Sequence, residues 1–356
     1  DINNTFIDFK SDNLETNFDE VASIIPSLKN IKEVNLSRLG NIRYQGNFTG
    51  FLSDFVGFGT INTSLGTVTG DINLKLPESK PPVYSGKIST EGFRLGDFLN
   101  DNRIGAITFT GKVNGSGVTA QTLKASFDGN IKSVQYQDYV YQNLMVRGNI
   151  EKKLFSGFAS IDDPNLKIDQ LSGTINFNNA EPEFNFDALL SRSDFKKLKL
   201  TNETFELTGH FNLNFTGSNI DNFLGTARIS NATLRHENLP LSFDSLMITS
   251  NIQDGQKFLS LQSNELDAHI KGKYQIMELP DAFKIFLSRY YPAYIKRPGY
   301  IVKDQDFSFE IKTKEADQYF QLIDKRLKGF DNSIITGNLK LKDNDLNVRA
   351  EVPSFS

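Results

Sequence analysis

Apolar and polar residues alternate over long stretches of this chain. The clearest run is 205–215, where every second position is Phe, Leu or Gly and the positions between them are Glu, Thr, His or Asn. Successive side chains of a β-strand point to opposite faces of its sheet, so this strand would have one apolar and one polar face. The pattern therefore predicts a one-sided antiparallel sheet, because strand–helix–strand alternation is not evident.

The same alternation recurs from residue 123 onward. The side chains on the apolar phase are the candidate lining of a groove: Leu123, Phe127, Ile131, Phe184, Phe186, Phe205, Leu207, Phe211, Leu213, Phe215, Leu266, Ile270, Phe307 and Phe309. Apolar area removed from water contributes roughly 25 cal/mol per Å². The face must therefore be covered by a second sheet, by helices or by a ligand. Without other information, such alternation is most often the core of a β-sandwich.

Turn-forming sequences recur about every 8 to 12 residues, as an antiparallel meander requires. Three Gly-containing pairs are predicted tight turns: Asn114-Gly115, Asp128-Gly129 and Asp254-Gly255. Two segments are predicted strand breakers: Lys80-Pro81-Pro82 and Asp163-Pro164-Asn165.

Three helices are expected among the strands. One follows Asn17 and ends or bends near Pro26, one begins at Pro280 and continues to residue 290, and one covers 316–327 before Gly329. Short turns are expected at 95–99, 194–198 and 220–223. No linker is evident, so we expect one continuous groove segment over 1–356. Its soft subdivisions are a helix-containing entry (1–45), repeating strand units (46–280), a helix-containing insertion (281–330) and final, incomplete strands (331–356).

Composition excludes several classes of function. Cysteine is absent, which removes disulfides and thiolate chemistry, and the net charge of −4 argues against a nucleic-acid-binding surface. The histidines at 210, 236 and 269 are scattered, and no nucleophile elbow or calcium-loop pattern is present. We therefore expect no enzyme, metal or cofactor. Tyr290, Tyr291 and Tyr294, followed by Lys296-Arg297, are candidate contacts for lipid headgroups, although plain solvation is the simpler interpretation.

A loose repeat joins an alternating strand, a Gly, a short Asp/Asn–Phe–Leu turn and another Gly-containing strand. Its copies are 215–226, then 92–99 with Ile104-Gly105, and then Phe48-Thr49-Gly50 with Phe55 and Gly59-Thr60. Further characteristic stretches are 50–70, Tyr84-Ser85-Gly86 to Leu95-Gly96, 110–117, 139–144, 161–166 and 193–195. In this order the motifs resemble the TamB-like branch of the AsmA superfamily, in its Bacteroidota form, over nearly the whole chain.

The resemblance implies an elongated antiparallel meander curled into a U-shaped open groove, a β-taco, with a few short helices and an apolar lining. It further implies a periplasmic segment of an inner-membrane-anchored protein, whose anchor lies outside this segment and whose partner is an outer-membrane barrel of the BamA/TamA-like kind. The family has no catalytic residues to transfer. The functional surface would be the lining itself.

Three functions remain open from the sequence. The first is a passive conduit for phospholipid acyl chains between the inner and outer membranes, in support of outer-membrane biogenesis. The second is a scaffold or chaperone for outer-membrane protein assembly, which would contact a barrel by an edge strand. The third is an adhesin-like β-sandwich at the cell surface.

Overall fold

The computed structural model of the chain describes residues 4–24, 29, 34–77, 80–119, 121–237, 239–300, 302–323 and 328–353. The protein is mainly β, with 61% of residues in strands and 11% in helices. Its 19 strands belong to one antiparallel meander that does not close into a barrel over the described residues. The chain divides into two compact units, residues 1–178 with 195–202, and residues 179–194 with 203–356.

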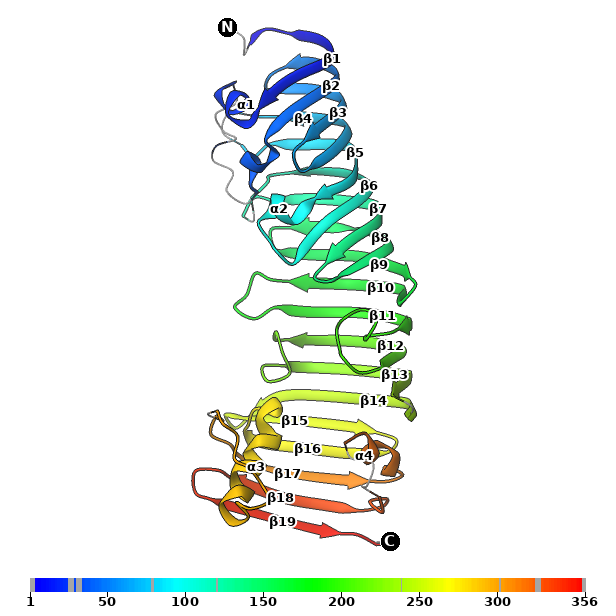
Figure 1. Ribbon diagram of the computed structural model, residues 1–356, viewed down its shortest axis with the longest axis vertical. Coiled ribbons are helices and arrows are strands. Elements are labelled where there is room, and N and C mark those ends of the chain that lie inside the picture. The colour runs from blue at the N-terminus through cyan, green and yellow to red at the C-terminus, as the bar shows by residue number, and fades with distance from the viewer. Residues whose placement is uncertain are drawn as a thin grey trace. The chain divides into compact units, whose positions relative to one another are not determined.

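Unit 1 contains ten strands, each paired with the next one in the chain (Figure 1). They are β1 (Ile7–Asn17), β2 (Asn41–Phe51), β3 (Asp54–Thr63), β4 (Gly66–Lys75), β5 (Val83–Arg94), β6 (Ile104–Ser116), β7 (Lys124–Tyr136), β8 (Tyr139–Glu151), β9 (Leu154–Asp163) and β10 (Leu166–Asn176). Its helical elements are α1 (Phe18–Ile24), the 3-10 helix η3 (Leu36–Leu39) and α2 (Leu95–Leu99).

Unit 2 contains nine strands, also paired in chain order. They are β11 (Glu183–Ser193), β12 (Phe205–Thr216), β13 (Leu224–His236), β14 (Leu239–Gln253), β15 (Gln256–Ser263), β16 (Leu266–Lys273), β17 (Asp306–Thr313), β18 (Ile334–Lys340) and β19 (Asp345–Glu351). Its helical elements are the 3-10 helix η4 (Ile276–Glu278), α3 (Leu279–Tyr290) and α4 (Asp317–Ile323).

The predicted helices are confirmed where the structure describes them. The third prediction extends over residues 324–327, which lie outside the described residues, as does Pro26. Segments 194–198 and 220–223 contain turns, and 95–99 is the short helix α2.

Two of the predicted tight turns are wrong, and their glycines explain why. Asn114-Gly115 lies inside β6 and Asp128-Gly129 inside β7, whereas Asp254-Gly255 does turn the chain between β14 and β15, with both residues at positive φ. Gly129 faces Gly111 across the β6–β7 pair, where a Cβ would stand 2.9 Å from the Thr110 carbonyl oxygen. Gly129 is therefore needed for the close approach of two strands and not for a turn.

Both predicted strand breakers are confirmed. Asp163-Pro164-Asn165 closes the β9–β10 hairpin, and Lys80-Pro81-Pro82 precedes β5. The Asp163 carboxylate is buried and accepts hydrogen bonds from the Tyr139 hydroxyl (2.5 Å) and the backbone N–H groups of Gln142 (3.0 Å) and Asn165 (2.8 Å). The side chain therefore organises its own turn and fastens it to β8.

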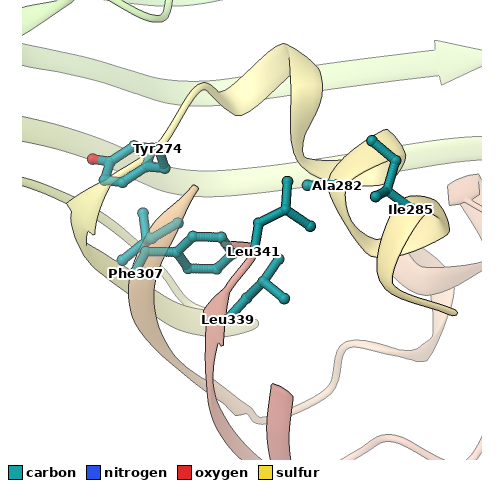
Figure 2. Close-up of a cluster of buried hydrophobic side chains, with 7 residues drawn as sticks. Tyr274, Ala282, Ile285, Phe307, Leu339 and Leu341 are labelled. Atoms are coloured by element: carbon teal, nitrogen blue, oxygen red, sulfur yellow. The ribbon is translucent and has the colours of Figure 1, made fainter. Parts of the chain in front are cut away.

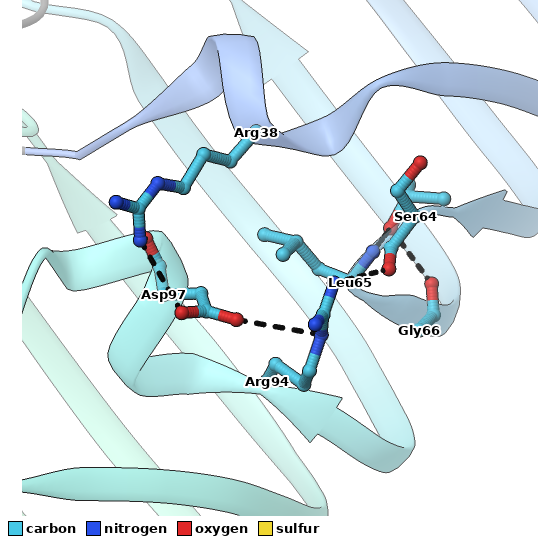
Figure 3. A network of polar contacts seen from close by, with 7 residues as sticks. Arg38, Ser64, Leu65, Gly66, Arg94 and Asp97 are labelled. Atoms are coloured by element: carbon cyan, nitrogen blue, oxygen red, sulfur yellow. Dashed lines mark hydrogen bonds and ion pairs between the residues drawn. The ribbon is translucent and has the colours of Figure 1, made fainter. Parts of the chain in front are cut away.

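A polar network holds η3 and α2 against the β3–β4 turn (Figure 3). The Asp97 carboxylate lies 3.2 Å from Arg38 Nη1 and 3.4 Å from Arg94 Nε, and Arg94 Nη2 donates to the Ser64 carbonyl oxygen at 2.8 Å. Leu65 is buried beside this network. The ion pairs are partly exposed, and each contributes less than about 1 kcal/mol to the stability of the fold. Their main effect is therefore to fix where η3 and α2 lie.

Within the described residues every strand belongs to one open sheet, so no separate second sheet covers its apolar phase. The chain exposes 21423 Å² at a mass of 40.0 kDa, about one and a half times the surface of a compact monomer of that mass. Most side chains on the apolar phase are only half-buried. The structure therefore corresponds to the expected open sheet and not to the sandwich that alternation alone would favour.

Candidate functional site

One face of unit 1, called here the inner face of unit 1, carries the apolar phase of its strands. Near β1–β5 it forms an apolar cavity of about 440 Å³. The residues that line this cavity are Phe9, Leu14, Tyr44, Phe48, Phe55, Gly57, Gly59, Ile61, Val68, Gly70, Ile72, Leu74 and Ile88. Most of these side chains are half-buried or exposed, so this apolar surface remains in contact with water in the isolated chain.

Strand register assembles this lining from residues distant in sequence. Phe48 is directly opposite Gly57, and the rings of Phe48 and Phe55 have centroids 4.4 Å apart. The Tyr44 side chain lies over Gly46 on its own strand and over Gly59 on β3. Its hydroxyl donates to the carbonyl oxygens of Asn47 (2.7 Å) and Phe58 (3.3 Å), which holds it there. Burial raises the pKa of Tyr44, so its hydroxyl stays neutral and does not place a charge in the lining.

The opposite face of unit 1, its outer face, carries rows of charged and polar side chains together with exposed apolar residues such as Phe58 and Phe158. Cross-strand register places Asp71, Lys87, Lys112, Asp128 and Arg147 in one row over β4–β8. A neighbouring row consists of Asn and Ser residues, and both rows line a depression of about 610 Å³ whose lining also includes Val56, Val113 and Phe127. The two faces of the same strands therefore offer different surfaces, and the cavity with the almost wholly apolar lining lies on the inner one.

The apolar phase of unit 2, its inner face, has a second cavity of about 320 Å³ on β15–β17. It is lined by Leu259, Leu261, Ala268, His269, Ile270, Leu279, Phe283, Phe307, Phe309 and Ile311. Leu279 and Phe283 belong to α3, which covers this part of the face. Figure 2 shows the buried cluster beside the helix, in which Phe307 and Leu339 come from the sheet and Ala282 and Ile285 from α3.

The structure places most of the predicted lining on the inner faces, but in separate groups. In unit 1, Phe127 and Ile131 lie on β7, while Leu123 belongs to the turn before it. In unit 2, Phe184, Phe186, Phe211, Leu213 and Phe215 form paired rows on β11 and β12, and the rings of Phe184 and Phe215 stack with centroids 4.9 Å apart.

Phe205 and Leu207 occupy the other end of β12, opposite His236 and Leu234 of β13, and Leu266 begins β16. Ile270, Phe307 and Phe309 alone among the predicted residues line the unit 2 cavity. Ile270 and Phe307 are covered by α3 and only 9% and 4% exposed, so they are far less open than the rest of the predicted lining.

Sequence reasoning missed the cavity lining on β1–β5. There the alternation is interrupted by glycines, such as Gly57, Gly59 and Gly70, at positions where a large apolar residue is expected. Counting Gly as a member of the apolar phase here, as in 205–215, would have revealed these strands, because in unit 1 Gly59 pairs with both Gly46 and Gly70 on the same face.

Each of the three histidines lies beside one acidic side chain. His210 Nε2 lies 2.8 Å from the Asp187 carboxylate, and this hydrogen bond lowers the pKa of Asp187. His236 Nε2 lies 2.8 Å from Glu203, and His269 Nδ1 lies 4.0 Å from Glu310. Within the described residues, no group of His, Cys, Asp or Glu has the arrangement of a metal site.

In the described part of the chain, no helix combines the length and the hydrophobicity required to cross a bilayer. Comparisons with protein-family models, with curated proteins and with solved structures give no match to this chain.

Proposed function

We propose that the inner faces of the two units bind the hydrocarbon chains of phospholipids. In this proposal the chain acts as a passive lipid conduit in the periplasm, between the inner and outer membranes, and catalyses no reaction. The observation that carries the proposal is the apolar cavity of unit 1, because its lining is large, apolar and incompletely covered by the protein itself. A flexible apolar ligand would remove this surface from water and so bind favourably.

Three features support a hydrocarbon ligand over a polar one. The cavities on both inner faces have almost wholly apolar linings, and no ion pair within the described residues crosses the lining of the unit 1 cavity. The hydroxyl of Tyr44 is already engaged with backbone carbonyl oxygens. The site therefore offers contact area and few directional groups, which suits acyl chains of varied length.

The compartment and the partner come from the resemblance to TamB-like proteins and remain predictions. The same applies to contact with a BamA/TamA-like barrel and to an anchor outside this segment.

Matched substitutions on β3 test the proposal. Ile61 lines the unit 1 cavity and is 37% exposed, whereas Val56 lies on the outer face of the same strand and is 47% exposed. Both side chains are β-branched and reach solvent, so Glu can be introduced at either position without burying a charge completely. We expect Ile61→Glu to weaken binding of a fluorescent phosphatidylglycerol by at least about tenfold, because a carboxylate would then face the hydrocarbon.

Val56→Glu should bind the same fluorescent lipid as the parent protein does. Circular dichroism and thermal unfolding of both variants provide the folding control. Equal binding by the parent and Ile61→Glu, with both folded, would contradict the proposal, as would an equal loss in the two variants.

A further inference from the structure

An exposed loop rich in tyrosine, residues 291–300, follows α3 in unit 2. Tyr290 ends the helix, and Tyr291, Tyr294 and Tyr300 follow within ten residues, all exposed to solvent. Tyr294 is 89% exposed, the highest value among the exposed large hydrophobic residues of the described chain. Exposed aromatic side chains that gather in one segment can serve as an interaction surface.

The charge of this segment is opposite to that of the chain. Residues 289–303 contain four basic residues and no acidic residue, whereas the whole chain has 39 basic and 43 acidic residues. Lys296 and Arg297 are exposed, and neither forms an ion pair with any described residue. They are therefore available to an external anion.

The nearby acidic groups are already engaged. Asp281 contacts Lys284 and the Tyr300 hydroxyl, and Asp304 lies within ion-pair distance of Lys273 and Lys342. Glu278 accepts a hydrogen bond from the backbone N–H of Lys303 at 2.7 Å. These contacts leave the positive charge of Lys296 and Arg297 uncompensated by close partners.

The loop is held in place by hydrogen bonds. The backbone N–H groups of Tyr294 and Ile295 both donate to the Tyr291 carbonyl oxygen, at 3.1 and 2.9 Å. The Tyr290 hydroxyl accepts from Asn344 Nδ2 at 2.8 Å, which ties the end of α3 to the β18–β19 turn. An ordered loop loses little conformational entropy when it binds, so even a small contact surface can be effective.

We propose that this loop docks the protein on an anionic phospholipid surface. Tyrosine has an apolar ring and a polar hydroxyl, which suits the boundary between headgroups and hydrocarbon, and Lys and Arg pair with phosphate groups. The loop directly follows α3, whose Leu279 and Phe283 line the unit 2 cavity. The proposal concerns the membrane surface and stands independently of lipid binding on the inner faces.

Vesicle co-sedimentation tests the charge requirement. The parent protein should bind vesicles of phosphatidylglycerol and phosphatidylcholine, and binding to phosphatidylcholine alone should be much weaker. Lys296→Gln combined with Arg297→Gln should reduce binding to the anionic vesicles by about 30-fold, which is about fivefold per basic residue. The matched control replaces Lys152 and Lys153, an adjacent exposed basic pair in the β8–β9 turn, with Gln. This control should bind as the parent protein does.

A fluorescence measurement locates the contact, because the chain contains no tryptophan. The emission of Tyr294→Trp should shift to shorter wavelength on anionic vesicles, and the emission of Tyr136→Trp, at an exposed position on β7, should not. The proposal is overturned if the parent protein does not bind anionic vesicles, if the Lys152/Lys153 control loses as much binding as the loop variant, or if Tyr294→Trp shows no shift. Failure of either proposal leaves the other testable, because acyl-chain binding is measured with single lipids and docking with vesicles.

Discussion

The ring of Phe109 lies over Gly129 on the neighbouring strand, with its Cε2 atom 2.5 Å from the point where a Cβ would stand. The ring thus occupies the space that a side chain at Gly129 would need. Phe155 has the same relationship to Gly148, at 2.8 Å, and Phe309 to Gly337, at 2.9 Å. Aromatic rings that lie over glycines form part of the apolar surface of the inner faces. They also cover backbone that glycine would leave exposed.

This relationship predicts which glycines tolerate a side chain. Gly129→Ala should lower the free energy of unfolding of unit 1 by about 2 kcal/mol, because the new methyl group meets Phe109 and the backbone of β6. Gly57→Ala is the matched control, since the nearest atom to its Cβ position, in the Phe55 ring, is 3.8 Å away. Urea unfolding measures both. A Gly129→Ala protein as stable as Gly57→Ala would contradict the claim that Phe109 packs closely over Gly129.

A buried hydroxyl in unit 2 predicts a stabilising substitution. Tyr274 is buried against Phe307, and its hydroxyl has no hydrogen-bond partner among the described residues. Tyr274→Phe should therefore raise the free energy of unfolding of unit 2 by about 1 kcal/mol.

Tyr319 provides the comparison within the same unit. Its hydroxyl donates to the Ser242 carbonyl oxygen at 2.9 Å, and burial raises its pKa to about 12. Tyr319→Phe should lower the free energy of unfolding by about 1 kcal/mol. Chemical denaturation followed by circular dichroism gives both values, and a destabilised Tyr274→Phe protein would show that its hydroxyl has a partner in solution.

The Asp101–Arg103 pair predicts a change with pH. Three N–H groups of Arg103 contact the carboxylate, at 2.6 to 3.0 Å, and these hydrogen bonds lower the pKa of Asp101 to about 2. A carboxyl whose pKa is lower in the folded state stabilises the protein above the pKa of the unfolded state, about 3.9. This contribution is lost as the pH falls from about 4 to about 2.

Removal of the Arg103 guanidinium should reverse the shift in the pKa of Asp101. In Arg103→Gln the pKa of Asp101 should rise toward the ordinary value, and Arg103→Lys should restore only part of the shift because it lacks the planar fork. Carboxyl ¹³C NMR titration measures each pKa. An unchanged pKa in Arg103→Gln would show that Arg103 does not hold it down.

The sequence predicted the class of fold because strand alternation is a local property. The run 205–215 became β12, with its Phe and Leu side chains on one face. Helix α3 was also predictable, from Pro280 at its first turn and the apolar stripe that follows. Both predictions depend only on neighbours along the chain.

The predictions that failed concern features that depend on contacts between elements distant in the sequence. Asp128-Gly129 has the sequence of a tight turn, and only its register against Gly111 shows why the glycine is there. Likewise, the burial of Ile270 and Phe307 follows from the position of α3 over β16 and β17, which no local pattern encodes. The lining on β1–β5 was missed because glycines interrupt its alternation.

Site-specific photocrosslinking tests most directly whether the inner faces bind lipid. A photoreactive phenylalanine analogue would be placed at Phe48 and Phe211 on the inner faces, and at Phe58 and Leu189 on exposed positions of the opposite phase. Phe58 is 57% exposed, so access to lipid alone would favour it. After irradiation with phospholipid, mass spectrometry should find lipid adducts at Phe48 and Phe211 and few at Phe58 and Leu189. Adducts that are equally frequent at all four positions, or absent from Phe48 and Phe211, would contradict lipid binding on the inner faces.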